Sequence, residues 1–154
     1  HESPKIMAPL TSLLRLSYQA FRAKPIEAFP QRQVVFRPVI DIRLLWNHES
    51  TRYRVLIDSG ADYCIFHSEV ADVLKIPVSE GKKITFYGTG GTPQTAYFHD
   101  VQIEVAGWPM ELYCGFSYDM KSLPYGILGQ TGFFDQFKIE FDYQAKRIEL
   151  KPRR

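Results

Sequence analysis

Hydrophobic and polar positions alternate along most of the chain in short runs, and turn residues separate one run from the next. In residues 52–57, two arginines alternate with Tyr53 and Val55, a pattern typical of a β-strand with one face in water. This run becomes wholly apolar at its end, immediately before Asp58. Many short strands with regular turns predict an all-β barrel or sandwich.

The first predicted strand contains Pro38, which lacks the N–H that a sheet interior needs and therefore marks a break, a bulge or an edge. A polar turn at residues 47–50 joins this strand to the next one and predicts a hairpin. Residues 137–141 and 147–150 predict a second hairpin at the C-terminus. The other expected strands cover residues 34–45, 52–57, 83–87, 94–105 and 110–116.

A short helix is expected over residues 68–75. Val70, Val73 and Leu74 have helical spacing there, and Ser68 is suited to cap the start.

The first 32 residues have a different composition from the rest of the chain. Four prolines break any long helix or strand, and a short leucine run at residues 13–16 is the main apolar feature. We expect residues 1–32 to form an extended arm that packs through a few side chains, or a linker. Residues 33–154 are expected to form one domain, since a chain of 154 residues can bury a sizeable core.

The formal net charge is +2, which is too small to indicate nucleic acid or an anionic membrane as a partner. No stretch reaches the ~18 consecutive apolar residues of a membrane span. The chain begins at His1 rather than Met, so an upstream signal or anchor that has been removed stays an open alternative.

The two cysteines, Cys64 and Cys114, are too few for a disulfide framework, and the four histidines stand singly without metal-ligand spacing. We therefore expect reduced, buried thiols and neither a metal nor a cofactor. This cysteine usage weakly favours a reducing compartment such as the cytoplasm.

The first candidate for chemistry is the segment from Asp58 to Asp62. An acid placed directly after an apolar strand lies at the rim of the core, where burial can perturb its pKa. Ser59 supplies a hydroxyl, and Gly60 allows a tight loop in front of Ala61. Taken alone, the same residues also suit an ordinary β-turn.

Two glycine-containing segments are further candidates. Gly88, Thr89, Gly90 and Gly91 separate two predicted strands, and such a tip can approach a ligand backbone closely. It is not a phosphate loop, because no Lys-Ser or Lys-Thr follows it. The third segment is a short apolar strand ending in glycine, formed by Ile127, Leu128 and Gly129, and one or two helical turns are expected to follow over residues 129–134.

In this order, the three segments resemble the retropepsins, the retroviral-type aspartic proteases. That family has an apolar strand leading into Asp-[Thr/Ser]-Gly-Ala, matched here by Leu56 to Ala61, with Ser59 in place of the commoner Thr. A flap hairpin with a Gly-x-Gly-Gly tip follows, and two apolar residues with a glycine precede a helix. The likeness covers residues 33–150, and within it residues 133–150 most resemble cellular members, bacterial ones especially. The terminal segments do not obviously match the strands by which retroviral enzymes dimerise.

The resemblance implies a single-domain all-β acid-protease barrel, with one short helix near the C-terminus and a flap that comprises Tyr87 and the glycine-rich tip. It implies Asp58 as the catalytic residue, supported by its loop. Aspartic proteolysis needs two carboxylates, and the chain has only one Asp-Ser-Gly, so a homodimer is expected. A peptide or protein substrate would lie extended beneath the flap, with Tyr87 and Ile127 beside its side chains.

Two other readings stay open at this point. A non-catalytic module of the same fold could bind extended peptides, because fold does not entail function. An unrelated β-barrel with a small-ligand pocket is the third possibility. The intact acid and the glycine-rich tip favour the protease, since a binding module has no need of the acid.

Overall fold

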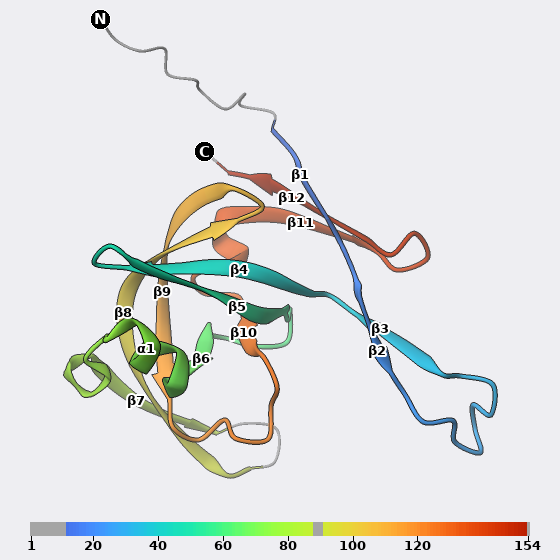
Figure 1. The fold of residues 1–154 in the computed structure, drawn as a ribbon, viewed down its shortest axis with the longest axis horizontal. Helices are drawn as coiled ribbons and strands as arrows, with labels where there is room; N and C mark the ends of the chain where they lie inside the picture. The colour runs from blue at the N-terminus through green and yellow to red at the C-terminus, as the bar shows by residue number, and fades with distance from the viewer. Residues whose placement is uncertain (1–11, 88–90, 154) are drawn as a thin grey trace, which may run out of the picture.

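The computed structural model describes residues 12–87 and 91–153, and all statements about the structure refer to these residues. It is an all-β protein with one short α-helix, as the sequence predicts (Figure 1). The main sheet has seven strands in the order β4-β5-β10-β6-β9-β8-β7, and a second pairing joins β4 to β8. This pairing closes the sheet into a barrel. Its strands are β4 (Val39–Trp46), β5 (Glu49–Ile57), β6 (Ile65–His67), β7 (Lys82–Tyr87), β8 (Pro93–Val105), β9 (Trp108–Ser117) and β10 (Gly126–Leu128).

The β4–β5 and β7–β8 hairpins are those that the sequence predicts. Strands β5, β7 and β8 are slightly longer than expected, whereas β4 begins only after Pro38. The turn between β4 and β5 is tighter than the expected four residues, because Asn47 and His48 both have positive φ angles, +45° and +71°. Ala106 and Gly107 make the same kind of turn between β8 and β9, with φ angles of +50° and +81°. Such two-residue turns match the right-handed twist of the strands that they join.

The core fills the barrel with side chains from every wall. Its largest fully buried members are Phe66, Phe116 and Phe133, surrounded by aliphatic residues of β4, β5, β8 and β9. A smaller apolar cluster around Ile65 and Phe98 lies toward β7. Burial of this apolar surface is the main force that holds the strands together.

The predicted helix is present as α1 (Ser68–Leu74), followed by a 3-10 turn, η1 (Val78–Glu80). Two details differ from the prediction. The cap position belongs to His67 and Ser68 is itself buried as the first helical residue, so Ser68 does not cap the helix. Val73 is 62% exposed, because it lies on the outer side of a helix that packs through Val70, Ala71 and Leu74.

The helical segment expected at residues 129–134 starts later and is shorter. It is a single 3-10 turn, η2 (Phe134–Gln136). A helix cannot run through residues 129–134, because Gly132 has a φ angle of +112°, outside the helical region. The N–H groups of residues 130 and 131 donate to Ala61 O (2.8 Å) and Asp62 O (2.9 Å). This segment is therefore part of the loop that carries the candidate site.

A second sheet contains both ends of the described chain in the order β1-β12-β11. Its strands are β1 (Leu14–Ser17), β11 (Phe137–Asp142) and β12 (Arg147–Pro152), of which the last two form the predicted C-terminal hairpin. Residues 14 and 16 of the expected arm are leucines that pack against the core. The two remaining strands, β2 (Gln19–Arg22) and β3 (Val34–Arg37), form a separate hairpin, so strand pairing crosses the expected boundary at residue 33.

Within the described part of the chain, no helix has the length and apolar character needed to cross a membrane.

Candidate active site

Asp58 is the first residue after β5, and backbone hydrogen bonds fix it at the end of the barrel. Its N–H donates to Leu128 O of β10 (2.9 Å), and its carbonyl accepts the N–H of Ala61 (3.2 Å). The N–H of Gly60 donates to the carboxylate oxygen Oδ1 (2.9 Å). The side chain is half-buried, so one carboxylate oxygen is oriented by the loop while the group as a whole still reaches solvent.

The two apolar motifs of the sequence lie side by side as parallel strands. Ile127 of β10 faces Leu56 of β5 in the register, and Leu128 faces Ile57. On its other side, β10 pairs with β6. The carboxyl ends of β5 and β10 therefore meet at one edge, which places Asp58 beside Gly129.

Three hydrogen bonds join the loop after Asp58 to the loop after Gly129. Gln130 donates its backbone N–H to Ala61 O (2.8 Å) and its side-chain Nε2 to Ser59 O (2.6 Å). Thr131 N–H donates to Asp62 O (2.9 Å). The carboxylate loop is thus held rigid by a segment about seventy residues away in the chain, as a pre-organised site requires.

Gly129 permits this close approach because it has no side chain. A Cβ atom at this position would collide with the carbonyl oxygen of Tyr63 and lie 2.7 Å from that of Ala61. Both contacts are with backbone atoms, which cannot rotate away. Gly129 therefore keeps the two loops in contact.

The buried Cys64 supports the same junction, a role that the sequence did not reveal. Its Sγ accepts the N–H of Gly129 (3.3 Å) and approaches Thr131 O (3.6 Å). Burial raises the pKa of the Cys64 thiol to about 12, so it is a neutral S–H. Both cysteines are free and buried, as expected. The only sequence signal for this role was the position of Cys64, shortly after the Asp58 loop.

A cleft of about 470 Å³ opens in front of Asp58. Tyr87 of β7 and Ile127 of β10 line it with Asp58, so the structure brings these three predicted residues together. The predicted tip residues Gly88, Thr89 and Gly90 lie outside the described residues. The strands on either side of them do form a hairpin, in which Tyr87 faces Pro93, and Gly91 is exposed with a φ angle of +77°.

Residues of the segment 118–125 also line the cleft, and His67 anchors this segment to the barrel. The Tyr53 hydroxyl accepts the backbone N–H of His67 (2.9 Å), so its own proton is free for the ring Nδ1 of His67 (2.6 Å). The ring Nε2 then carries the other proton and donates to Leu123 O (2.6 Å). Burial raises the pKa of Tyr53 well above its ordinary value, which keeps the hydroxyl neutral.

Replacing Tyr53 with phenylalanine is expected to destabilise the protein. The change leaves the backbone N–H and Nδ1 of His67 without their partner, which costs about 1–3 kcal/mol per buried polar group. Urea unfolding of the variant measures this loss. Tyr97→Phe is the control, since Tyr97 is also half-buried and its hydroxyl forms no hydrogen bond within residues 12–87 and 91–153. Equal stabilities of the two variants would contradict the role of the Tyr53 hydroxyl.

In the part of the chain that the structure describes, no three His, Cys, Asp or Glu side chains come together in a way that could hold a metal ion. The carboxylates that line the cleft are those of Asp58, Asp62 and Asp119. Asp119 accepts the N–H of Thr95 through Oδ2 (2.9 Å), so it binds β8 close to the tip of the β7–β8 hairpin. The arrangement offers an oriented carboxylate at the floor of a cleft bordered by apolar side chains.

Comparisons with known proteins agree with this geometry. The model of a family described as aspartyl protease matches residues 45–131, which include β5, the Asp58 loop and β10. A search of curated proteins finds no match to this chain.

Among solved structures, a retropepsin-like aspartic protease from Rickettsia conorii is similar, with 15% identity and a TM-score of 0.53. The likeness covers 86% of this chain and 98% of that one. EIAV protease, solved with the inhibitor HBY-793, has 24% identity and a TM-score of 0.46 over 61% of this chain and 82% of that one.

Proposed function

The chain belongs to the aspartyl protease family, and we propose that it is an aspartic endopeptidase whose active site is completed by a second copy of itself. The fold is retropepsin-like, as the sequence predicts. The observation that carries the proposal is the position of Asp58. Its carboxylate lies at the floor of the cleft, with Oδ1 oriented by Gly60 N–H at the junction of β5 and β10.

The proposed chemistry uses two Asp58 carboxylates that share one proton. The ionised carboxylate takes a proton from a water molecule, whose oxygen attacks the carbonyl carbon of the scissile peptide bond. The protonated carboxylic acid donates a hydrogen bond to the carbonyl oxygen. The C–N bond then breaks as the nitrogen receives a proton. Two carboxylates this close cannot both ionise, so the pair titrates as a unit.

The second carboxylate is proposed to come from a partner protomer. Asp58 is the only acid of the sequence that is followed by Ser-Gly. It lies at the end of the barrel, beside the cleft, where a two-fold axis can bring two copies together. A symmetric dimer would place the Asp58 residues of both chains across that axis.

The substrate is proposed to be an extended peptide that lies in the cleft. Its backbone would form hydrogen bonds with the site, and alternate side chains would enter pockets, as in other cases of β-strand recognition. Tyr87 is 71% exposed over the cleft, and Ile127 is partly buried in its wall. Both offer apolar surface to a substrate side chain, which favours cleavage next to apolar residues.

Activity is expected to depend on dimer formation and on pH. Because one carboxylate must be ionised and the other protonated, the rate should follow a bell-shaped profile with its maximum at acid pH. Cleavage of a denatured protein, measured across pH and protein concentration, tests this. Specific activity should fall on dilution as the protomers separate, whereas at high concentration it should reach a plateau.

Two outcomes would contradict the proposal. If sedimentation analysis shows that the protein is a monomer and this monomer is fully active, the shared dyad is ruled out. Binding of peptides without hydrolysis at any pH would instead favour the non-catalytic, peptide-binding alternative.

A further inference from the structure

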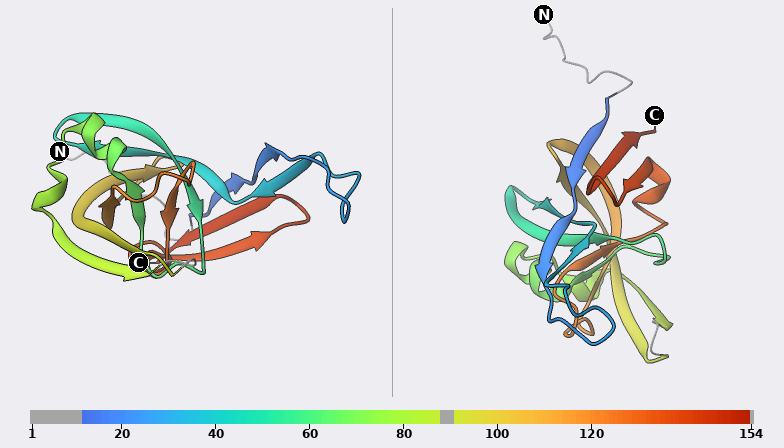
Figure 2. Two further views of the ribbon diagram at one scale, coloured as in Figure 1. Left: turned by 90° about the horizontal axis from the view of Figure 1, so that it is seen from below. Right: turned by 90° about the vertical axis from the view of Figure 1, so that its right-hand side faces the viewer.

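The β2–β3 hairpin, residues 19–37, projects away from the barrel. Figures 1 and 2 show it extending beyond the rest of the molecule. It is a two-stranded sheet of its own, and among the described residues it pairs with no other strand. No residue of the hairpin is buried. An isolated two-stranded hairpin is at best marginally stable in water, so this element is expected to have a binding partner.

The root of the hairpin lies at the same end of the barrel as Asp58. Strand β3 continues past Pro38 directly into β4, and Pro38 O accepts the N–H of Ile57, the residue before Asp58 (2.9 Å). Since β4 runs antiparallel to β5, β3 extends beyond the end at which β5 delivers Asp58. At about 3.3 Å per residue, the four residues of β3 alone reach roughly 13 Å past the barrel.

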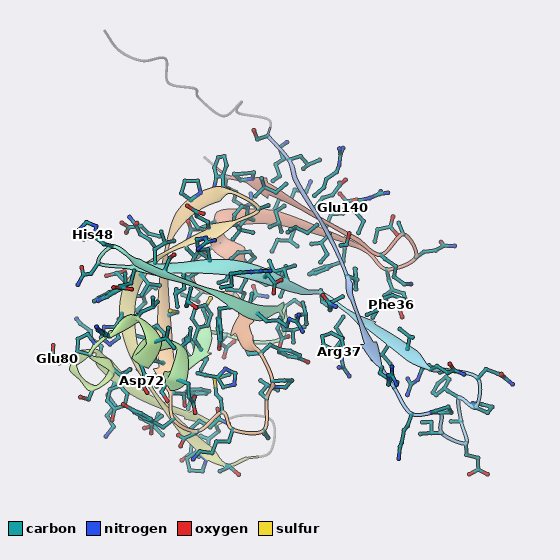
Figure 3. The ribbon with its side chains drawn as sticks, in the orientation of Figure 1. Phe36, Arg37, His48, Asp72, Glu80 and Glu140 are labelled. Carbon is teal, nitrogen blue, oxygen red and sulfur yellow. The ribbon has the colours of Figure 1, made fainter. Side chains whose placement is uncertain are left out.

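Side chains on both strands fix the root. Phe21 contacts the ring of Tyr125, which lines the cleft, at a centroid distance of 6.2 Å. The ammonium of Lys146 lies 4.8 Å from the ring centre of Phe36. Figure 3 shows Phe36 and Arg37 where the hairpin leaves the barrel. The direction of the projection is therefore set by contacts with Tyr125 of the barrel and with the turn between β11 and β12.

The tip of the hairpin is apolar and ordered. Ile26 and Phe29 are 49% and 56% exposed, although the N–H of Phe29 donates to Ile26 O (2.9 Å) and closes a tight turn. The guanidinium of Arg32 covers the Phe29 ring at 5.1 Å. Two large apolar side chains held in place and exposed to water are typical of an interface element.

The charge of the hairpin is complementary to the cleft. Residues 19–37 contain four basic residues and one acid, Glu27. The described residues that line the cleft include three acids, Asp58, Asp62 and Asp119, and no lysine or arginine. A hairpin of one copy would therefore be attracted to the cleft side of another copy.

We propose that the β2–β3 hairpin clasps a second copy of this chain. Each protomer reaches past its own Asp58 end and buries Ile26 and Phe29 against the barrel of its partner, beside the partner's cleft. A two-fold axis makes the contact reciprocal, so four apolar tip side chains are buried per dimer. The inference rests on the proposed function, which requires a partner at this end. It also provides a dimer contact in a chain whose terminal sequences do not obviously match the strands by which retroviral enzymes dimerise.

The test compares dimer dissociation constants by sedimentation equilibrium. Ile26→Ser with Phe29→Ser removes the apolar tip. A second variant joins Ala23 to Gln33 through Asn-Gly, which suits this position because Ala23 N–H donates to Gln33 O (2.9 Å) as in a two-residue turn. The matched control is Val73→Ser, which alters an apolar residue of α1 that is at least as exposed as Ile26 and Phe29. Peptide cleavage is measured on all proteins at high concentration.

Both hairpin variants are expected to raise the dissociation constant by about tenfold or more, with the control unchanged. Cleavage at saturating protein concentration should stay near wild type, because Asp58 is intact. An unchanged dissociation constant in both hairpin variants would overturn the proposed contact. It would also be overturned if a variant gained activity without a change in dimerisation, since the hairpin would then lie over the cleft of its own chain. A wild-type dimer that weakens in the variants but never cleaves peptide would retain the clasp and reject the protease.

Discussion

Replacing Asp58 with asparagine is expected to abolish peptide cleavage while the protein stays folded and dimeric. Asparagine has the shape of the carboxylic acid, so its oxygen can still accept the N–H of Gly60. It cannot take a proton from water at any working pH. Loss of general acid–base catalysis alone lowers a rate by about 10²–10⁴-fold, and both halves of the dyad are changed in the dimer. A continuous assay with a quenched peptide measures the loss.

The control for this experiment is Asp72→Asn. Asp72 is an exposed acid on α1. The same chemical change there should leave cleavage at the wild-type rate. Turnover by purified Asp58→Asn protein at a rate near that of Asp72→Asn would reject Asp58 as the catalytic residue.

Replacing Gly129 with alanine is expected to destabilise the protein by about 3 kcal/mol, the upper part of the range for over-packing a tight interior. The added methyl group would meet the carbonyl oxygens of Ala61 and Tyr63, which are fixed backbone atoms. The two loops would separate and the Gly129 N–H would lose Cys64 Sγ as its partner. Urea unfolding measures the stability, and cleavage should fall with it, because the Asp58 loop is held by this junction.

Gly60→Ala is the matched control for stability. Gly60 lies in the same loop pair, but a Cβ there would meet only Asp58 Oδ1, at 3.3 Å. Its unfolding free energy is expected to change by less than about 1 kcal/mol. If Gly129→Ala were as stable as Gly60→Ala, the close packing of the two loops would not be what holds the site.

The strands of the barrel could be predicted because they follow local rules. Arginines that alternate with Tyr53 and Val55 predicted a strand with one face in water. In the structure these arginines are exposed and Val55 is buried. Pro38 predicted a break, and the chain does divide there into β3 and β4. The turn residues at 47–50 predicted a hairpin without specifying that only two of them form the turn.

The supports of the candidate site could not be predicted, because they depend on contacts between distant parts of the chain. Cys64 bonds with Gly129, 65 residues away, and the ring of His67 bonds with Leu123, 56 residues away. The periodic pattern of apolar and polar residues carries no information about hydrogen bonds between such distant residues. The late start of η2 has a local cause, since Gly132 has a φ angle of +112° that lies outside the helical region. Residues 34–37 fall within an expected strand, but their partner β2 was not predicted, because it has only four residues and lies in the proline-containing arm.

The junction between the Asp58 loop and Gln130 also bears on when the chain acquires its chemistry. Ser59 and Gln130 are 71 residues apart, so their contact closes a long loop, and such contacts form late in folding. When synthesis has reached only the end of β9, the nascent chain therefore contains the whole Asp58 loop but lacks the segment that fixes it. Under the proposed dimeric mechanism, a nascent chain at that stage cannot cleave its neighbours, because residue 130 must be synthesised and two finished chains must meet before a peptide bond is cut.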